Sequence, residues 1–283
     1  MQENSYTHKL LEPQAVNALL AEHSDDDTDF LPVFVGSLES FAHRHIPGSS
    51  LITPMQLVAG IPPAVGKAPD EDDLQQLFES LGVSKETTLI AYDDEGGGWA
   101  GRLVWTLDII GHSNYLIVNG GIHAWADSGL ALEDGNTQAQ RVPTTYPVAI
   151  DRSQVPGVAE IVAAIDSEEV HIWDARSAQE YSGEKVLAAR GGHMPGAKNL
   201  DWLDLMDRHN SLRLKPYGDL EQLIEQRGFS RSDGKTVITH CQSHHRSGLT
   251  YLVGKLMGLN ILAYDGSWSE WGNLPDTPIV SEN

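Results

Sequence analysis

The chain has 283 residues, a hydrophobic content of 40% and a formal net charge of −21 at pH 7. This length suits two domains better than one, because domains cluster near about 100–150 residues. The acidic balance argues against a nucleic-acid partner, since neutralising phosphates needs clustered Lys and Arg.

The first half of the chain alternates between expected strands and helices. Pro13 is well placed to open a first helix, because its missing N–H has no partner to lose at the first helical position. The apolar runs 88–92 and 115–118 have the length of buried parallel strands, and 99–109 between them is a candidate helix.

The second half repeats this alternation after a segment without sustained periodicity, residues 133–158, which is rich in Gly, Pro, Thr and Gln. Strand–helix–strand alternation predicts an α/β fold with mostly parallel sheets flanked by helices. The expected strands are 170–173, 236–239 and 261–263, and the expected helices are 220–227 and 248–257.

Three ordered matches within the chain indicate an internal repeat. The matched pairs are His45–Gly48 with His193–Gly196, Thr88–Asp93 with Thr236–Cys241, and Asn119–Trp125 with Asp265–Trp271. The first two pairs are 148 residues apart and the third is 146 apart. We therefore expect two similar domains, residues 12–133 and 159–283, joined by a linker at 134–158.

The stretch ITHCQSHHRSGLTY, residues 238–251, carries the single cysteine, Cys241, directly after an expected strand. Residues 242–247 would turn the chain into a helix that begins near Gly248. Backbone N–H groups of such a loop and of the first helical turn bind anions, and with Arg246 they lower the pKa of a thiol. Cys241 is therefore a candidate nucleophile beside an anion site. The candidate substrate-binding residues of the loop are Gln242, Ser243, His244, His245, Arg246 and Ser247.

Two other interpretations of Cys241 are a buried structural thiol and a metal ligand. Cys241, His244 and His245 form a compact C-x2-H-H pattern, but no second Cys/His pair stands elsewhere at zinc-site spacing. We expect no metal and no organic cofactor. One cysteine cannot form an internal disulfide, which fits a reducing compartment. With neither a secretory signal nor a long apolar run, we expect a cytoplasmic protein with no membrane partner.

These residues resemble the rhodanese (thiosulfate sulfurtransferase) superfamily in its two-domain form. The segment YDGSWSEWG, residues 264–272, is typical of tandem sulfurtransferases, and CQSHHRS looks like the loop of a bacterial thiosulfate:cyanide subgroup. The resemblance implies two rhodanese-like domains with the catalytic cysteine only in the second. In the first copy Asp93 stands where Cys241 stands in the second, in an acidic loop that we expect to repel anions.

The resemblance also implies that Arg176, in the motif Asp-x-Arg, binds the anionic end of a sulfur donor. Its alternative is a structural ion pair with Asp174 or Glu180. Arg246 also has two interpretations, either donor binding or bracing of the loop through backbone carbonyls. The matched HxPG elements are expected to be turns, and Trp268 and Trp271 are expected in the core.

The expected reaction moves the sulfane sulfur of thiosulfate onto Cys241 as a persulfide, with release of sulfite. Cyanide, a thiol or another protein then accepts the sulfur. Gln242 and Ser243 match neither the basic residue of thiosulfate enzymes nor the small residues of mercaptopyruvate enzymes. Val35 and Gly36 replace a usual acidic residue, which favours thiosulfate over 3-mercaptopyruvate.

Two rival functions share the same loop chemistry. Cysteine-dependent phosphatases and arsenate reductases space their groups as C-x5-R, whereas this chain has C-x4-R from Cys241 to Arg246. The shorter cradle suits a single sulfur better than a tetrahedral phosphate. The other rival is a persulfide carrier that delivers sulfur to a partner without fast turnover.

Overall fold

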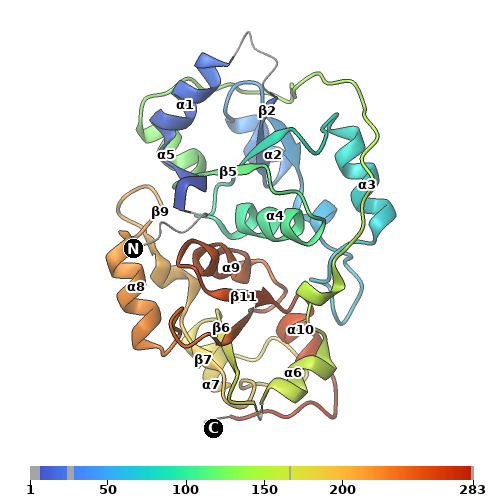
Figure 1. Ribbon diagram of the computed structural model, residues 1–283, viewed down its shortest axis with the longest axis vertical. Coiled ribbons are helices and arrows are strands. Elements are labelled where there is room, and N and C mark those ends of the chain that lie inside the picture. The colour runs from blue at the N-terminus through green and yellow to red at the C-terminus, as the bar shows by residue number, and fades with distance from the viewer. Residues whose placement is uncertain (1–6, 24–28, 166, 282–283) are drawn as a thin grey trace.

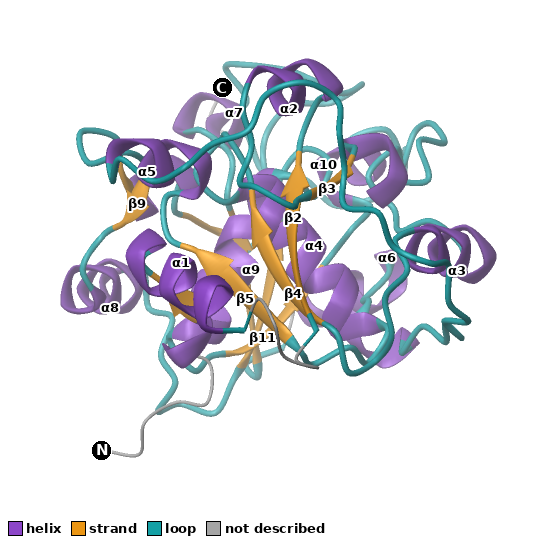
Figure 2. Cartoon of the chain, turned by 90° about the horizontal axis from the view of Figure 1, so that it is seen from above, coloured by secondary structure: helices purple, strands orange, loops and turns teal. Residues whose placement is uncertain are grey.

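The fold is described from a computed structural model over residues 7–23, 29–165 and 167–281. The other residues of the two expected domains lie outside this description. The chain forms two α/β units, the first at the top of Figure 1 and the second below it. Seen from above, strands form the interior and helices lie around them (Figure 2).

Over the described residues, the first unit has a parallel sheet of five strands in the order β1-β5-β4-β2-β3. Helices α1, α2 and α5 pack on one face of this sheet, while α3 and α4 pack on the other. Its elements are η1 (Thr7–Lys9), β1 (Leu10–Leu11), α1 (Pro13–Glu22), β2 (Phe30–Val35), α2 (Leu38–His43), β3 (Ser50–Ile52), η2 (Pro54–Leu57), α3 (Glu71–Ser80), β4 (Thr88–Tyr92), α4 (Gly98–Ile109), β5 (Tyr115–Val118) and α5 (Gly121–Asp127).

The second unit, in the part that is described, has a parallel sheet of four strands in the order β11-β10-β6-β7. A short antiparallel pair, β8 with β9, lies outside this sheet. Its elements are η3 (Arg152–Gln154), α6 (Val158–Ile165), β6 (Val170–Asp174), α7 (Ala178–Ser182), β7 (Lys198–Asn199), η4 (Trp202–Leu205), β8 (Met206–Asp207), β9 (Arg213–Leu214), α8 (Tyr217–Gln226), β10 (Thr236–His240), α9 (Arg246–Leu256), β11 (Asn260–Ala263) and α10 (Ser267–Trp271).

The sequence predicted nine of these elements, the strands β4, β5, β6, β10 and β11 and the helices α1, α4, α8 and α9. Strands β4 and β5 have the expected bounds, and α1 begins at Pro13. One boundary differs in a way that affects the site, because α9 begins at Arg246 and not near Gly248. Arg246 and Ser247 therefore lie in the first helical turn, where their positions are fixed by helical geometry.

The internal repeat is visible in matched local structure. His45 stacks on Phe41 and His193 stacks on Tyr181, with ring centroids 3.9 and 3.7 Å apart. In both units the Nδ1 of the histidine is hydrogen-bonded to the backbone oxygen of the aromatic residue on which it stacks. The glycines that end the two HxPG elements have positive φ, so these elements are turns, as predicted.

The segment that connects the two units has no helix or strand at residues 134–151, and it packs on the first unit. Tyr146 is buried and stacks on Phe78 of α3, with ring centroids 5.0 Å apart. The Arg141 guanidinium donates to the Asp29 carboxylate. Most of the expected linker is therefore held against the first sheet, and α6 begins at its last residue, Val158.

Helices α4 and α9 bring the two units together (Figure 1). A Cβ at Gly101 would lie 2.3 Å from the Gly248 carbonyl oxygen, and one at Gly248 would lie 2.4 Å from the Gly98 carbonyl oxygen. The two backbones therefore touch where side chains would hold them apart. One hydrophobic cluster runs through this contact and includes Trp105 of α4 and Leu249 of α9.

None of the helices within the described ranges is long and apolar enough to cross a membrane.

We expect G101A to lower the free energy of unfolding by about 1–3 kcal/mol, because a methyl group cannot enter a packed backbone contact without displacing a helix. G218A is the matched control, since a Cβ at this position of α8 meets nothing within 4 Å. G218A should leave the free energy of unfolding unchanged or raise it by less than about 1 kcal/mol. Urea unfolding measures both. Equal effects of the two substitutions would contradict the close helix contact.

Candidate active site

Cys241 lies at the carboxyl end of β10, between the strand and the first turn of α9. β10 is flanked by β6 and β11, so the cysteine sits at the centre of the sheet edge. The Cys241 N–H donates to Ser267 Oγ at 3.3 Å, and its carbonyl accepts from the Trp268 N–H at 3.0 Å. The residue is 0% exposed. Its backbone is thus fixed from both sides.

The surroundings of Cys241 favour a thiolate. Burial works to raise the pKa of the thiol, because a charged sulfur loses its hydration. The Arg246 cation, the Ser247 hydroxyl and the backbone N–H groups of Ser243 and Ser247 oppose this, and together they hold the pKa below its ordinary value. A lowered pKa is what a sulfur nucleophile needs near neutral pH.

Arg246 is held by Glu180 of α7. Its Nη1 and Nη2 donate to the two carboxylate oxygens of Glu180 at 2.7 and 2.8 Å, a bidentate pair. Glu180 is 1% exposed, and its carboxylate also accepts from the Ser177 hydroxyl. The alternative expected for Arg246, bracing through backbone carbonyls, is therefore wrong for its described contacts: its partner is a carboxylate on another helix.

Glu180 carries a strongly shifted pKa. Burial tends to raise it, but the hydrogen bonds and charge of Arg246 and the hydrogen bonds from Ser177 lower the pKa to about 2. The sequence named Glu180 only as an alternative partner for Arg176. Its pairing with Arg246 links α7 to the first turn of α9 and so holds the cation beside Cys241.

Arg176 is buried and paired with Asp174, one of the two ion-pair alternatives named from the sequence. Its Nε and Nη2 donate to the Asp174 carboxylate, and Nη2 also donates to the Gly192 carbonyl. The guanidinium lies over the ring of Trp268, 4.1 Å from its centroid. Trp268 is itself buried in the core, as predicted. Donor binding by Arg176 stays a prediction.

His245 connects the catalytic loop to the first unit. Its Nε2 lies 2.6 Å from Glu95 Oε2, and its ring stacks on Trp99 at 4.3 Å. Trp202 of the second unit lies on its other flank, 5.6 Å between centroids. The acidic loop of the first unit was expected only to repel anions. Glu95 in that loop instead contacts His245, which belongs to the loop 242–247 after Cys241.

Asp93, the counterpart of Cys241, fills its own loop with its carboxyl group. The two side-chain oxygens accept hydrogen bonds from the backbone N–H groups of Glu95, Gly97 and Ala100. Burial nevertheless raises the pKa of this carboxyl group above its ordinary value. Ile122 N–H donates to the Asp93 carbonyl, just as Trp268 N–H donates to that of Cys241. The strand–loop–helix corner therefore gathers amide donors around a carboxyl group in the first unit.

His244 is the most constrained residue of the loop. It is fully buried and has φ +54°, a left-handed conformation that costs a non-glycine residue roughly 1 kcal/mol. Its Nδ1 lies 2.7 Å from Ser247 Oγ, and its ring meets Trp105 of α4 edge-on at 4.5 Å. Strain of this kind persists only where the surrounding structure holds it in place.

Arg102 of α4 is a site residue that the sequence did not point to. It is fully buried, donates to the carbonyls of Leu57 and Gly66, and approaches the His244 carbonyl at 3.5 Å. Burial lowers the pKa of its guanidinium to about 10, despite the charges of Asp265 and Cys241. The one feature of the sequence that could have pointed to Arg102 is a basic residue within a mostly apolar expected helix, 99–109.

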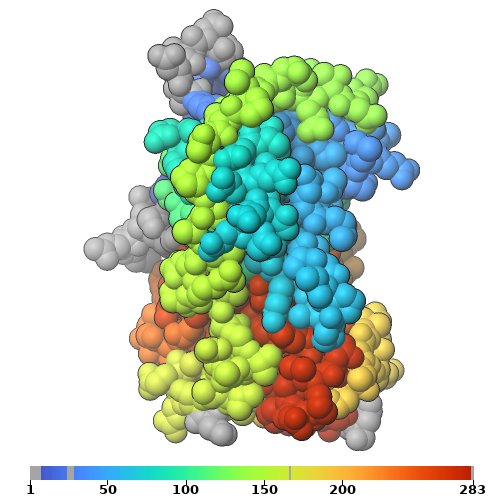
Figure 3. Space-filling view, turned by 90° about the vertical axis from the view of Figure 1, so that its right-hand side faces the viewer, coloured from blue at the N-terminus to red at the C-terminus, as the bar shows by residue number. Residues whose placement is uncertain are grey.

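A loop of the first unit, residues 59–69, crosses onto the second unit. A Cβ at Gly66 would lie 2.2 Å from the Ser243 carbonyl oxygen. Lys67 pairs with Glu270 at 2.5 Å, and the Ala68 N–H donates to Asp265 at 2.9 Å. Figure 3 shows this light-blue stretch reaching onto the red C-terminal part of the chain. The catalytic loop is thus enclosed by both units.

The remaining loop residue of the prediction, Gln242, faces the second unit, where its Nε2 donates to the Leu187 carbonyl at 3.1 Å.

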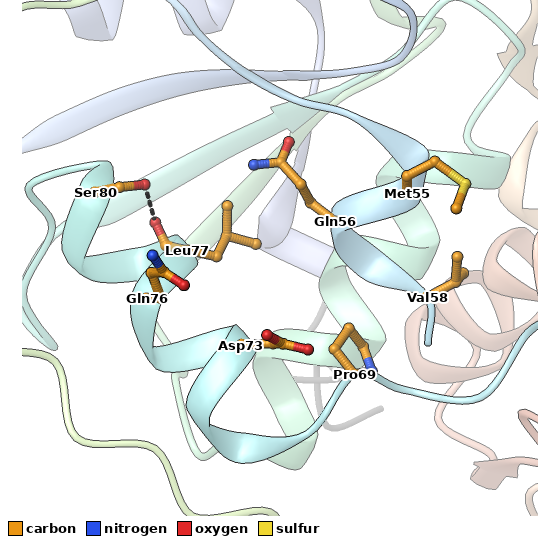
Figure 4. Close-up of a pocket in the computed structure, with 8 residues that line it drawn as sticks. All are labelled: Met55, Gln56, Val58, Pro69, Asp73, Gln76, Leu77 and Ser80. Atoms are coloured by element: carbon orange, nitrogen blue, oxygen red, sulfur yellow. Dashed lines mark hydrogen bonds between the residues drawn. The ribbon is translucent and has the colours of Figure 1, made fainter. Parts of the chain in front are cut away.

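A pocket of about 380 Å³ between η2 and α3 contains none of the expected site residues (Figure 4). Its lining is Met55, Gln56, Val58, Pro69, Asp73, Gln76, Leu77 and Ser80.

The histidines near Cys241 point to different partners. His240 Nδ1 is bonded to the Cys241 carbonyl oxygen and His244 Nδ1 to Ser247 Oγ, while His245 Nε2 lies 2.6 Å from Glu95 Oε2. Among the described residues, no group of three or more His, Cys, Asp or Glu side chains is placed to hold a metal ion.

Comparison with known proteins agrees with this geometry. The rhodanese-like domain family matches residues 16–128 and 158–274. The chain belongs to this family. The two matched segments correspond to the internal repeat, so the rhodanese fold occurs here in tandem, as the sequence predicted.

Relatives of this rhodanese cover most of its length. It is 41% identical over 273 residues to "Thiosulfate sulfurtransferase" of Azotobacter vinelandii, covering 95% of this chain and 96% of the relative. A protein of the same name from Pseudomonas aeruginosa is 42% identical over 254 residues, 89% and 91% of the two chains. "Sulfur carrier protein TtuD" of Thermus thermophilus is 31% identical over 230 residues, 77% and 79% of the two chains.

Among solved structures, wild-type EanB matches with a TM-score of 0.88 at 21% identity, over 100% of this chain and 71% of its own. At that identity the likeness shows the fold alone.

The Glu180–Arg246 pair predicts a specific acid sensitivity. Because the folded pKa of Glu180 is depressed to about 2, its contribution is present in full above the unfolded pKa near 4.5 and is lost as the pH falls toward 2. We expect the stability difference between wild type and E180Q to be constant above about pH 5 and to shrink below it. Urea unfolding across pH measures this difference. E184Q, at an exposed glutamate of the neighbouring segment, is the matched control. A difference independent of pH would contradict the pairing.

Proposed function

We propose that this rhodanese transfers the sulfane sulfur of thiosulfate through a persulfide on Cys241. The observation that carries the proposal is the Cys241 thiol, with its pKa lowered by Arg246, Ser247 and backbone amides at the end of a central strand. Relatives that share 41–42% identity over nearly the whole chain are named thiosulfate sulfurtransferases, which supports the same donor.

In the first step the Cys241 thiolate attacks the outer sulfur of thiosulfate. The sulfur–sulfur bond of the donor breaks, sulfite leaves with the bonding pair, and Cys241 becomes a persulfide with a terminal anionic sulfur. Arg246 and the loop amides stabilise the charge as it moves along the sulfur chain, since fixed dipoles follow it without reorganising. Gln242, Ser243, His244, His245 and Ser247 supply the loop that is proposed to bind the anion.

In the second step an acceptor nucleophile attacks the terminal sulfur and leaves Cys241 as thiolate. Cyanide would give thiocyanate, and a thiol would give a new persulfide. A protein thiol is a further candidate acceptor. The cycle requires Cys241 to be reduced between turnovers, which supports the proposal that the protein works in the cytoplasm.

We expect thiosulfate to leave wild-type protein one sulfur atom heavier, with the added sulfur on Cys241, and cyanide to remove it. C241S should gain no sulfur and show no turnover, while its circular dichroism stays that of the wild type. Intact mass spectrometry and a thiocyanate assay measure these outcomes. Since the chain has one cysteine, sulfur on the wild type has a single candidate site. Turnover by C241S near the wild-type rate would overturn the assignment.

Arg176 offers a test of structure against donor binding. We expect R176K to lower the free energy of unfolding by about 1–3 kcal/mol, because an ammonium group cannot reproduce the bidentate contact with Asp174. The proposed donor contact would in addition raise the KM for thiosulfate. Urea unfolding and steady-state kinetics measure the two effects. Lowered stability with an unchanged KM would contradict donor binding and make Arg176 a structural residue.

A persulfide carrier is a second candidate, because the relative from Thermus thermophilus is named a sulfur carrier protein. A catalyst produces many equivalents of thiocyanate from thiosulfate and cyanide, whereas a carrier transfers one equivalent to its acceptor. Counting product per Cys241 separates them. Comparing kcat/KM for thiosulfate and 3-mercaptopyruvate tests the donor.

A further inference from the structure

In the sulfur-transfer steps above, the two histidines of CQSHHRS belong to the loop proposed to bind the anion, but their imidazole rings have no role of their own. His245 is taken up by Glu95 and Trp99 of the first unit. His244 faces inward and is fully buried, and its Nδ1 lies 2.7 Å from Ser247 Oγ. Ser247, also fully buried, lies in the first turn of α9, and its hydroxyl is one of the groups that lower the pKa of Cys241. A line of three buried groups therefore leads from His244 through Ser247 to the nucleophile.

The position of one proton decides which group donates and which accepts along this line. A serine hydroxyl has a single proton to donate and two lone pairs that accept. If Ser247 donates to His244, its oxygen turns only lone pairs toward Cys241, and these repel a thiolate. If Ser247 instead accepts a proton from His244 Nδ1, its own proton is free to donate to Cys241 Sγ. The tautomer of His244 therefore decides whether Ser247 stabilises the thiolate.

The surroundings of His244 select the second arrangement. Burial, with the nearby Arg102 cation, lowers the pKa of the imidazole well below its ordinary value, so the ring carries one proton. Its Nε2 is buried and has no hydrogen-bond partner among the described residues. A proton on Nε2 would be a buried, unpaired donor, which proteins avoid more strictly than an unpaired lone pair. A proton on Nδ1 is paired with Ser247.

The left-handed backbone and the packing of His244 hold this arrangement in place. Its φ is +54°, and Trp105 of the first unit lies edge-on against its ring. Arg102 packs over Trp105, 4.5 Å from the ring centroid, and approaches the His244 carbonyl. Two side chains of α4 thus restrict the movement of the imidazole. These contacts come from the unit that lacks a cysteine.

We propose that His244 is a positioning residue that acts through Ser247: His244 Nδ1–H donates to Ser247 Oγ, and this holds the Ser247 hydroxyl donating to Cys241 Sγ. The inference rests on Cys241 being the sulfur nucleophile of the proposed function. It gives the first unit a part in the chemistry, because Trp105 and Arg102 of α4 hold the imidazole in position.

The test measures the thiol itself. Since Cys241 is the only cysteine, the ultraviolet absorbance of its thiolate across pH, taken against C241S, reports its titration directly. We expect S247A and H244A each to raise the pKa of Cys241, and the double variant to raise it no further than S247A alone. At neutral pH, kcat/KM for thiosulfate should fall about tenfold in H244A, as expected for the loss of a hydrogen bond to a charged group.

H244N provides the rescue. The Asn side-chain amide carries an N–H at the same number of bonds from the backbone as Nδ1, and Asn tolerates positive φ better than most residues. H244N should therefore restore the thiol titration toward the wild type, whereas H209A, at an exposed histidine, should leave it unchanged.

An unchanged thiol titration in H244A would overturn the proposal, and so would a further rise when H244A is added to S247A. These outcomes are separate from the proposed function, because a protein that takes no sulfur from thiosulfate still titrates its thiol.

Discussion

The backbone contact between α4 and α9 is the constraint on which the site depends. Gly98 and Gly101 on one helix and Gly248 on the other remove the side chains that would otherwise separate the two units. Closer approach lets α4 reach the loop that precedes α9. Arg102 and Trp105 then lie against His244, and Glu95 and Trp99 lie against His245. The described catalytic loop is therefore built by one unit and held by the other.

Two ion pairs lie near Cys241, and only one of them contains the cation that lowers the pKa of the thiol. Arg176 and Asp174 form a buried ion pair beneath the loop, and Arg246 and Glu180 form a second pair beside the thiol. Removing one member of such a pair leaves an uncompensated buried charge, which destabilises the fold by several kcal/mol in other proteins. Arg246 is the cation whose charge lowers the pKa of Cys241, so Glu180 sets the position of that charge. The position of α7, which carries Glu180, therefore affects the pKa of Cys241 through Arg246.

The same strand–loop–helix corner carries Asp93 in the first unit and Cys241 in the second. In the first unit the amides of the loop enclose the Asp93 carboxylate, which belongs to the loop itself. In the second unit the same corner carries a thiol and a nearby cation. An internal carboxylate leaves no room for an external anion, because its oxygens already accept the amide hydrogen bonds. The first unit has the same corner geometry without a thiol, and it contacts the second unit through α4 and the loop 59–69.

Local pattern was enough to predict five of the strands, the repeat and the position of Cys241 at the end of a strand. Buried parallel strands are short apolar runs, and a repeat needs only constant spacing, so both can be recognised without knowing any contact. The partners of the charged side chains could not be predicted in this way. Glu180 and Arg246 are 66 residues apart, and His244 and Arg102 are 142 apart. Such partners depend on strand order and on the packing of α4 against α9. Only the tertiary structure therefore decided that Arg176 pairs with Asp174, that Glu95 pairs with His245, and that Arg102 reaches the loop around Cys241.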